Sequence, residues 1–164
     1  MERTKTFSWQ DPTIGATEAL QMEGMDYLTA MYDGKLPGPP IMHTLDFKMH
    51  SIESGKAIFS FVPQEFHYNP IGSVHGGVIS TLLDSAMGCT VHTLMPKGKA
   101  YTTLELKVNF LKAITKKSGE LFAVGKMIYN GGRTALVEAQ IIDSNNKIFA
   151  YGVSTCLIFD VQKQ

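Results

Sequence analysis

The sequence predicts an α+β domain in which an antiparallel sheet wraps around one long buried helix. The helix is expected at residues 73–95, the longest stretch of the chain without proline or a cluster of turn residues. Its apolar side chains cover nearly the whole circumference of a helix, a pattern typical of a buried helix rather than a surface one. The flanking segments are short, rich in β-branched and aromatic residues and separated by turn sequences, which predicts strands that pair antiparallel.

An amphipathic arm is expected ahead of this domain. In residues 17–32, apolar residues recur at roughly helical spacing, and Thr17 is a suitable N-cap. The segment DGKLPGPP (33–40) follows, and neither a helix nor a central strand tolerates its prolines and glycines. We therefore predict a helical arm and linker over residues 1–43 and the sheet domain over residues 44–164.

The expected strands begin with a hairpin and end with a four-stranded antiparallel meander. Residues 44–50 and 56–62 flank the turn sequence SIESG and form the hairpin. The first strand of the meander alternates clearly, as in a half-buried strand: apolar Leu104, Leu106, Val108 and Phe110 alternate with polar Thr103, Glu105, Lys107 and Asn109. The meander strands are expected at residues 101–112, 118–129, 133–142 and 147–159, with hairpin turns at NGG (130–132) and DSNNK (143–147).

Composition narrows the function classes. The 164 residues suffice for one domain, and fifteen basic residues balance fifteen acidic ones, so no charge excess indicates a nucleic-acid partner. Cys89 and Cys156 are isolated in apolar stretches without CxxC spacing, which favours buried thiols in a reducing compartment. Because the N-terminus lacks the features of a secretion signal and no run of eighteen apolar residues occurs, we expect a cytoplasmic protein without a membrane partner.

The start of the long helix has an unusual composition. Gly76 and Gly77 stand in its first turn, where each glycine costs about 1 kcal/mol relative to alanine. The first N–H groups of a helix have no internal partner, so bare glycines there allow a ligand oxygen to approach. Such a site suits the negative charge that develops on a carbonyl oxygen under attack. The alternative is that the glycines serve close helix–sheet packing.

Asp84 lies in the middle of the same apolar helix, where an unpaired carboxylate is costly to bury. It follows Gly77 by seven residues, which places both on nearly the same face, about 10 Å apart along the axis. That distance is long for one subunit to hold a reacting carbon between the two groups. A two-fold dimer solves this by placing Asp84 of one helix beside Gly76 of the other. The structural alternative is that Asp84 caps a neighbouring strand or pairs with an arginine.

These residues together resemble a known family. The string Asn69-Pro-Ile-Gly-Ser-Val-His-Gly-Gly77, followed seven residues later by Asp84, is similar to that of the hotdog-fold acyl-CoA thioesterases of the PaaI-like type, named for phenylacetic acid degradation. The similarity continues through LELKVNFLKAI (104–114), GGRTALVEAQI (131–141) and the final strand, and it covers about residues 44–159.

The resemblance implies a reaction and roles for particular residues. The implied reaction is hydrolysis of an acyl-CoA thioester to free CoA and a carboxylic acid, with no cofactor because CoA is part of the substrate. The Gly76 amide would bind the thioester oxygen, Asn69 would help to position or polarise it, and Asp84 would act as general base or nucleophile. Thr103 would hold the attacking water. The resemblance also implies homodimers with two interfacial sites, often assembled as homotetramers.

Further residues are candidates for binding the substrate. Gly77 has the same bare backbone as Gly76, and His75 beside it has the pKa range of a general base, although a hydrogen bond that fixes the helix start is the favoured interpretation. Lys112 and Arg133 resemble family positions that meet the phosphates of CoA; the alternative is that each is an ordinary solvated charge. The five histidines are scattered, so no metal site is expected.

Two other functions stay open on the sequence. Hotdog folds also host enoyl-CoA hydratases and dehydratases, for which His75 would have to serve in an acid–base pair. A non-catalytic acyl-CoA-binding protein is the other, because a fold alone does not fix a function. The identity of the acyl group and the role of the arm, with its methionines Met22, Met25 and Met31, are left open.

Overall fold

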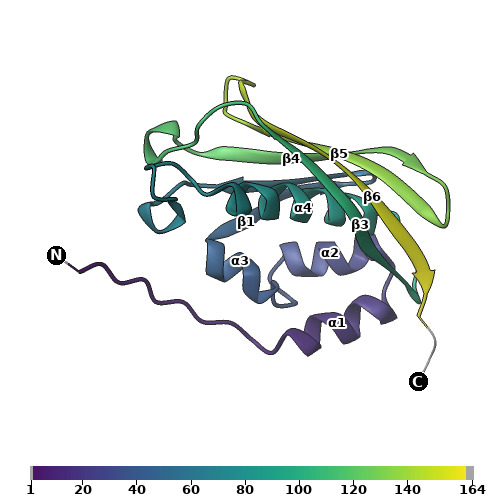
Figure 1. Cartoon of the computed structure of the whole chain (residues 1–164). Helices are drawn as coiled ribbons and strands as arrows, with labels where there is room; N and C mark the ends of the chain where they lie inside the picture. The colour runs from purple at the N-terminus through teal and green to yellow at the C-terminus, as the bar shows by residue number, and fades with distance from the viewer. Residues whose placement is uncertain (1, 162–164) are drawn as a thin grey trace.

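The computed structural model describes residues 2–161, which form one antiparallel sheet with helices stacked on its inner side (Figure 1). The sheet has six strands in the order β1-β2-β4-β5-β6-β3. Helix α4 contacts five of these strands, β2 to β6, and the arm helices lie beyond α4 on the side away from the sheet. The strands are β1 (Phe47–Glu53), β2 (Lys56–Phe61), β3 (Lys99–Phe110), β4 (Leu121–Asn130), β5 (Thr134–Ile142) and β6 (Ile148–Asp160), and the helices are α1 (Pro12–Gln21), α2 (Gly24–Tyr32), α3 (Pro40–Leu45) and α4 (Gly76–His92).

Helix α4 is the centre of the hydrophobic core, as its sequence predicts. Leu82, Leu83, Ala86 and Met87 are fully buried on it, and they pack with apolar residues from the strands of the sheet. The prediction of an antiparallel sheet wrapped around one long central helix is therefore confirmed. Within residues 2–161, no helix has both the length and the hydropathy needed to cross a bilayer.

The predicted four-stranded meander is wrong in one strand. Strands β4, β5 and β6 follow one another as neighbours, but β3 pairs with β6 at the edge of the sheet instead of with β4. Between β3 and β4 the chain passes from the edge of the sheet, beyond β6 and β5, to an interior position beside β2. A pattern of hydrophobic alternation carries no information about such a crossover. As a result, β3 has one unpaired edge within the described chain.

The arm contains two helices where the sequence predicts one that starts at Thr17. The first helix, α1, starts earlier because Pro12 occupies its first turn and the Asp11 side chain accepts a hydrogen bond from the Thr13 N–H at 2.9 Å. The chain then bends before Gly24, whose N–H donates to the carbonyl oxygen of Met95 at 2.8 Å. This contact fixes the start of α2 against the end of α4.

Helix α3 corrects the expected boundary between linker and first strand. Pro40 begins a helix because proline is tolerated at the first helical position, where no N–H is needed. The helix ends at Asp46, whose left-handed backbone (φ 56°) turns the chain into β1. The first strand therefore begins at Phe47 rather than at residue 44.

Candidate active site

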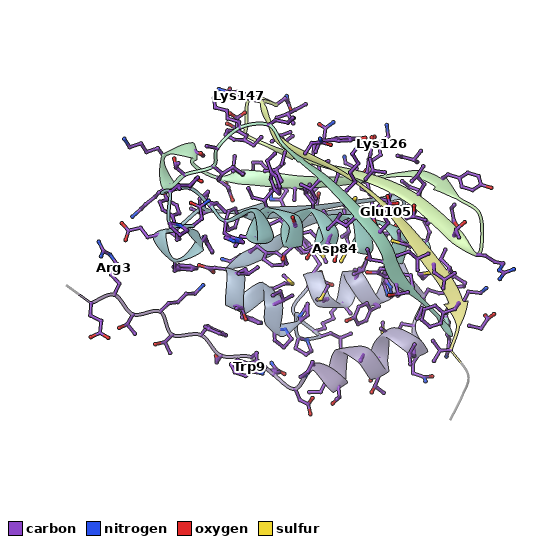
Figure 2. All side chains as sticks on the ribbon, in the orientation of Figure 1. Arg3, Trp9, Asp84, Glu105, Lys126 and Lys147 are labelled. Carbon is purple, nitrogen blue, oxygen red and sulfur yellow. The ribbon has the colours of Figure 1, made fainter. Side chains whose placement is uncertain are left out.

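Asp84 and Thr103 form a hydrogen-bonded pair between α4 and β3. The Thr103 hydroxyl donates to Asp84 Oδ1 at 3.0 Å. Asp84 is half-buried, and the ion pairs within residues 2–161 leave it without a cationic partner. It lines a cavity of about 220 Å³, which Thr103 and Ser85 also line, and in Figure 2 it lies between α4 and the arm helices. An acidic group that is partly desolvated, held by a hydroxyl and open to a cavity is suited to activate water or to attack a carbonyl.

A β-bulge turns Thr103 toward Asp84. Strict alternation along the strand predicts that Leu104 faces the core and Thr103 faces away, and this prediction is wrong. In the β3–β6 pairing, Thr103 lies opposite Cys156 and Glu105 lies opposite Thr155, so Leu104 is an extra residue. The bulge reverses the phase of the strand. Leu104 is consequently 59% exposed.

The start of α4 leaves one amide open. His75 is the N-cap, and its Nδ1 accepts a hydrogen bond from the Gly77 N–H at 2.9 Å. The Gly77 amide is therefore already engaged, whereas the Gly76 N–H takes part in none of the hydrogen bonds formed within the described residues. Of the two glycines, Gly76 is thus the one whose N–H can meet a ligand oxygen at the positive end of the helix dipole.

Gly76 and Asn69 line a second cavity, of about 300 Å³, together with Phe110 and Lys112. The Asn69 side chain holds the loop before the helix: its Oδ1 accepts from the N–H groups of Ile71 and Ser73 at 3.1 and 3.2 Å. The structure therefore brings Asn69 and Gly76 together at one cavity, and it brings Asp84 and Thr103 together at another. Gly76 and Asp84 are eight residues apart on α4, or about 12 Å along its axis.

The two candidate phosphate-binding residues lie at opposite ends of the sheet. The Lys112 N–H donates to the Phe149 carbonyl near the start of β6, while the Arg133 carbonyl accepts from the Ile158 N–H near its end. Both side chains are exposed. The pKa of Lys112 is lowered, chiefly because its ammonium group lies beside the amine of Lys147. Within one chain, Lys112 therefore lies near Gly76, whereas Arg133 lies toward the other end of the molecule.

Burial decides which neighbouring groups can react. Burial, with a smaller contribution from the Asp84 charge, raises the pKa of the Cys89 thiol to about 12, so this cysteine stays protonated and is a poor nucleophile. Burial also raises the pKa of Tyr101 well above its usual range, so its phenol is protonated too. In the part of the chain that the structure describes, no group of three or more His, Cys, Asp or Glu residues could hold a metal ion.

The sequence left the role of the arm open, and the structure places part of the arm at this site. The Asp84 cavity is lined by Met31 of α2, by Pro39, which directly precedes α3, and by Met42 of α3. Tyr101 of β3 lines it as well. The methionine content of the arm was the only signal of this contribution, and methionines are as frequent in ordinary cores as in ligand cavities.

Comparisons with known proteins identify relatives of this chain. The sequence profile of the thioesterase superfamily matches residues 71–150. A Sulfurisphaera tokodaii protein that is provisionally assigned as an esterase is 35% identical over 105 residues, which cover 64% of this chain and 76% of that protein. The 1,4-dihydroxy-2-naphthoyl-CoA hydrolase of Listeria monocytogenes is 27% identical over 118 residues, covering 72% of this chain and 93% of that enzyme.

A solved structure shows the same fold. A phenylacetic acid degradation-related protein of Ralstonia eutropha, provisionally assigned as a thioesterase, matches with a TM-score of 0.73 and 24% identity over 80% of this chain and 98% of that one. The fold is thus that of the hotdog enzymes. The chain belongs to the thioesterase superfamily, and it is a thioester hydrolase. The expected relationship to hotdog thioesterases of the phenylacetic acid degradation type is confirmed at the level of family and fold.

Proposed function

We propose that the protein hydrolyses acyl-CoA thioesters to free CoA and a carboxylic acid at a site shared by two subunits of a homodimer. The observation that carries the proposal is the Thr103–Asp84 pair, a half-buried carboxylate that is held by a hydroxyl beside a cavity and that no cation among residues 2–161 neutralises. The CoA part of the substrate draws on the Listeria monocytogenes relative, whose name specifies an acyl-CoA substrate. We place this protein in the cytoplasm because its two cysteines are free thiols, as expected in a reducing compartment.

The dimer in this proposal forms along the unpaired edge of β3. That strand is twelve residues long, and its Leu104 and Phe110 side chains are 59% and 55% exposed. Long, apolar strand edges readily pair with another copy of the chain. If two β3 strands pair antiparallel about a two-fold axis, the two α4 helices also run antiparallel. The Gly76 end of one helix then faces the Asp84 region of the other, and Lys112 of one subunit comes to the same side as Arg133 of its partner. Two such dimers would form the tetramer.

In the proposed mechanism, the thioester oxygen accepts a hydrogen bond from the Gly76 N–H of one subunit, with Asn69 close by. Asp84 of the partner removes a proton from water, which Thr103 positions, as the water attacks the carbonyl carbon. The tetrahedral intermediate collapses, the carbon–sulfur bond breaks and the thiolate of CoA leaves. Direct attack by Asp84 is the alternative route, and it gives an anhydride that water then hydrolyses.

Replacing Asp84 tests the proposal. The isosteric change Asp84→Asn removes the base but keeps the shape, so kcat for acyl-CoA hydrolysis should fall about 100-fold or more while KM changes little. Release of the CoA thiol from an acyl-CoA panel measures this, and a parallel assay of enoyl-CoA hydration distinguishes a hydratase. Near-normal turnover by Asp84→Asn would contradict the assignment, and tight acyl-CoA binding without thiol release by the wild type would indicate a non-catalytic binder.

A further inference from the structure

Another cavity lies next to the Asp84 cavity, in a groove between the arm and the main domain that is partly open to solvent. It has a volume of about 540 Å³, in the range of small-molecule sites. We call it the arm chamber. Ala19 and Leu20 of α1 and Leu28 of α2 form one side of it, and Ala100 of β3 and the end of α4 form the other. Figure 1 shows α1 and α2 stacked on the side of α4 away from the sheet.

The arm chamber adjoins the Asp84 cavity directly. Met31, Pro39, Cys89 and Tyr101 line both cavities, so these four residues form the wall that the two spaces share. Met31 is flexible and can change its rotamer to admit a ligand. An acyl group whose carbonyl carbon lies beside Asp84 is therefore next to the chamber, and its chain can extend into it.

The chamber is suited to hydrocarbon because it offers almost no charge. Its one lysine, Lys99, is ion-paired with Asp160 at 3.4 Å. His92 also lines it, and burial lowers the pKa of this histidine, so the ring is neutral near pH 7. By contrast, another cavity that adjoins the Asp84 cavity, of about 550 Å³, has the charged residues Lys5, Lys48 and Asp46 in its lining as well as apolar ones. An apolar chain would enter the chamber rather than this charged space.

Helix α2, one wall of the chamber, is firmly attached to the main domain. The Gly24 N–H bonds to the Met95 carbonyl at 2.8 Å, and a Cβ at Gly24 would lie 1.8 Å from the His92 carbonyl oxygen, so only glycine permits this approach. Tyr27 stacks edge-on against His92 with ring centroids 5.2 Å apart. Leu28 is 1% exposed. The chamber wall is therefore part of the folded unit.

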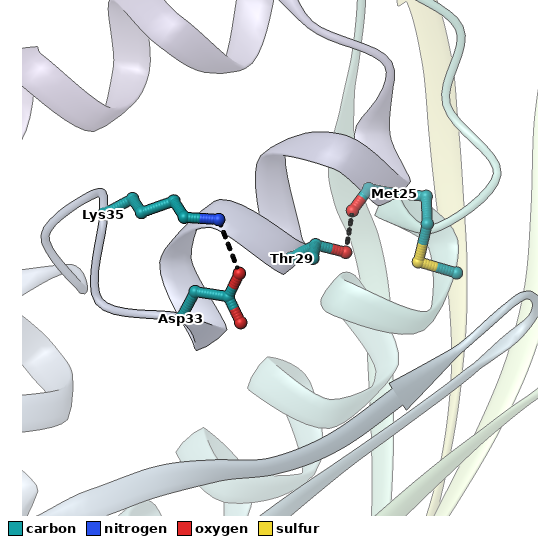
Figure 3. A network of polar contacts seen from close by, with 4 residues as sticks. All are labelled: Met25, Thr29, Asp33 and Lys35. Carbon is teal, nitrogen blue, oxygen red and sulfur yellow. Dashed lines mark hydrogen bonds and ion pairs between the residues drawn. The ribbon is translucent and has the colours of Figure 1, made fainter.

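Helix α2 presents its polar side away from the chamber. The Thr29 hydroxyl on α2 donates to the Met25 carbonyl at 2.8 Å, and directly after the helix the Lys35 ammonium is paired with Asp33 at 2.8 Å. Figure 3 shows both contacts. Thr29, Asp33 and Lys35 are exposed. The polar groups on this side of α2 are therefore hydrogen-bonded locally or exposed to solvent. The apolar residues Leu28 and Met31 line the chamber instead.

We propose that the arm chamber holds the acyl chain of the substrate, so that the enzyme prefers thioesters of extended, apolar acyl groups over acetyl thioesters. This inference rests on the proposed function, because it takes the carbonyl at Asp84 as its starting point. Each methylene that moves from water into such a chamber strengthens binding about fourfold. A substrate whose acyl chain has several methylenes should therefore bind more tightly than an acetyl thioester.

Filling the chamber tests the inference. Ala19→Phe places a ring into the chamber, and Thr17→Phe places the same ring at an exposed position of α1 that does not line it. The expected wild-type kcat/KM is about tenfold or more higher for lauroyl-CoA than for acetyl-CoA. Ala19→Phe should lower the lauroyl-CoA value about tenfold and leave the acetyl-CoA value within about threefold, whereas Thr17→Phe should change neither. A wild type that prefers acetyl-CoA, or an Ala19→Phe variant in which both values fall equally or neither falls, would overturn the inference.

A binding measurement separates this inference from the proposed function. Dodecyl-CoA and ethyl-CoA thioethers cannot be hydrolysed, so calorimetry reports chain binding without turnover. The dodecyl compound should bind about tenfold or more tightly than the ethyl compound to wild type, and Ala19→Phe should remove that difference. If these binding differences are found but no acyl-CoA is hydrolysed, the proposed function is wrong, whereas the assignment of the chamber as the binding site for the acyl chain is retained. If hydrolysis occurs with no effect of chain length on binding, the chamber assignment fails alone. Should Ala19→Phe not fold, Ala16→Phe, which fills the same chamber from the same helix, takes its place.

Discussion

At the scale of single residues, the site depends on one hydroxyl and one carboxylate. The Thr103 Oγ1 lies 3.0 Å from Asp84 Oδ1, and no cation within the described residues shares that carboxylate. A hydroxyl in this position fixes the rotamer of Asp84 and offers its oxygen to a water molecule in the adjoining cavity. The residue assignment came from a family resemblance, because the alternation of the strand by itself places Thr103 on the wrong face.

Thr103→Val tests this role. Valine has nearly the same shape but no hydroxyl, so Asp84 loses its hydrogen bond and kcat for acyl-CoA hydrolysis should fall about tenfold or more. Thr103→Ser keeps the hydroxyl and should retain most of the activity. Steady-state kinetics on both variants measures the difference. Equal activities of the valine and serine variants would show that the hydroxyl has no part in turnover.

At the scale of elements, the start of helix α4 supplies the electropositive end of the site. His75 accepts from the Gly77 N–H, which leaves the Gly76 N–H for a ligand. Because His75 has an extended backbone (φ −61°, ψ 137°), proline is sterically allowed directly after it, and proline is also well tolerated at the first position of a helix. The donor can therefore be removed without disturbing the helix.

Gly76→Pro should lower kcat about 100-fold, the effect of deleting one donor to a developing oxyanion. Gly76→Ala is the matched control: it adds a Cβ that also meets the Phe110 ring, 3.1 Å away, but it keeps the N–H. Acyl-CoA hydrolysis by the two variants, with thermal melts to confirm folding, gives the comparison. If the alanine variant loses as much activity as the proline variant, the added bulk and not the missing donor is responsible.

The edge strand β3 carries the proposed dimer contact. Leu104→Lys adds a charge at the bulge of this unpaired edge, and the dimer should dissociate because a lysine is costly to bury between two strands. Ile128→Lys is its control, since Ile128 is also exposed (49%) at a bulge, but on the interior strand β4, which pairs with β2 over residues 121–126 and with β5 over residues 122–130. Sedimentation velocity measures the assembly of each. A Leu104→Lys protein with unchanged mass in solution would contradict an interface along β3.

At the scale of the whole molecule, the sequence predicts the kind of fold but not how its parts are connected. Helix α4 was predictable because its apolar residues surround it, and β5 and β6 because turn sequences bound them. The edge position of β3 was not predictable, because it depends on a crossover that no local pattern records. The same holds for the site. Asp84 and Gly76 could be found in the sequence because a carboxylate and a glycine are unusual in a buried helix, whereas the position of Met31 in the cavity wall depends on how the arm folds back.

The central claim, a site shared by two subunits, is tested most directly by mixing two inactive proteins. Asp84→Asn and Gly76→Pro each remove one half of every site, but a mixed dimer keeps one site with an intact Gly76 amide and an intact Asp84. After subunit exchange of equal amounts, acyl-CoA hydrolysis should recover to about a quarter of the wild-type rate, since half of the dimers are mixed and each has one working site. A mixture that exchanges subunits fully, as mass spectrometry of the dimers can establish, yet stays as inactive as its components would contradict the shared site.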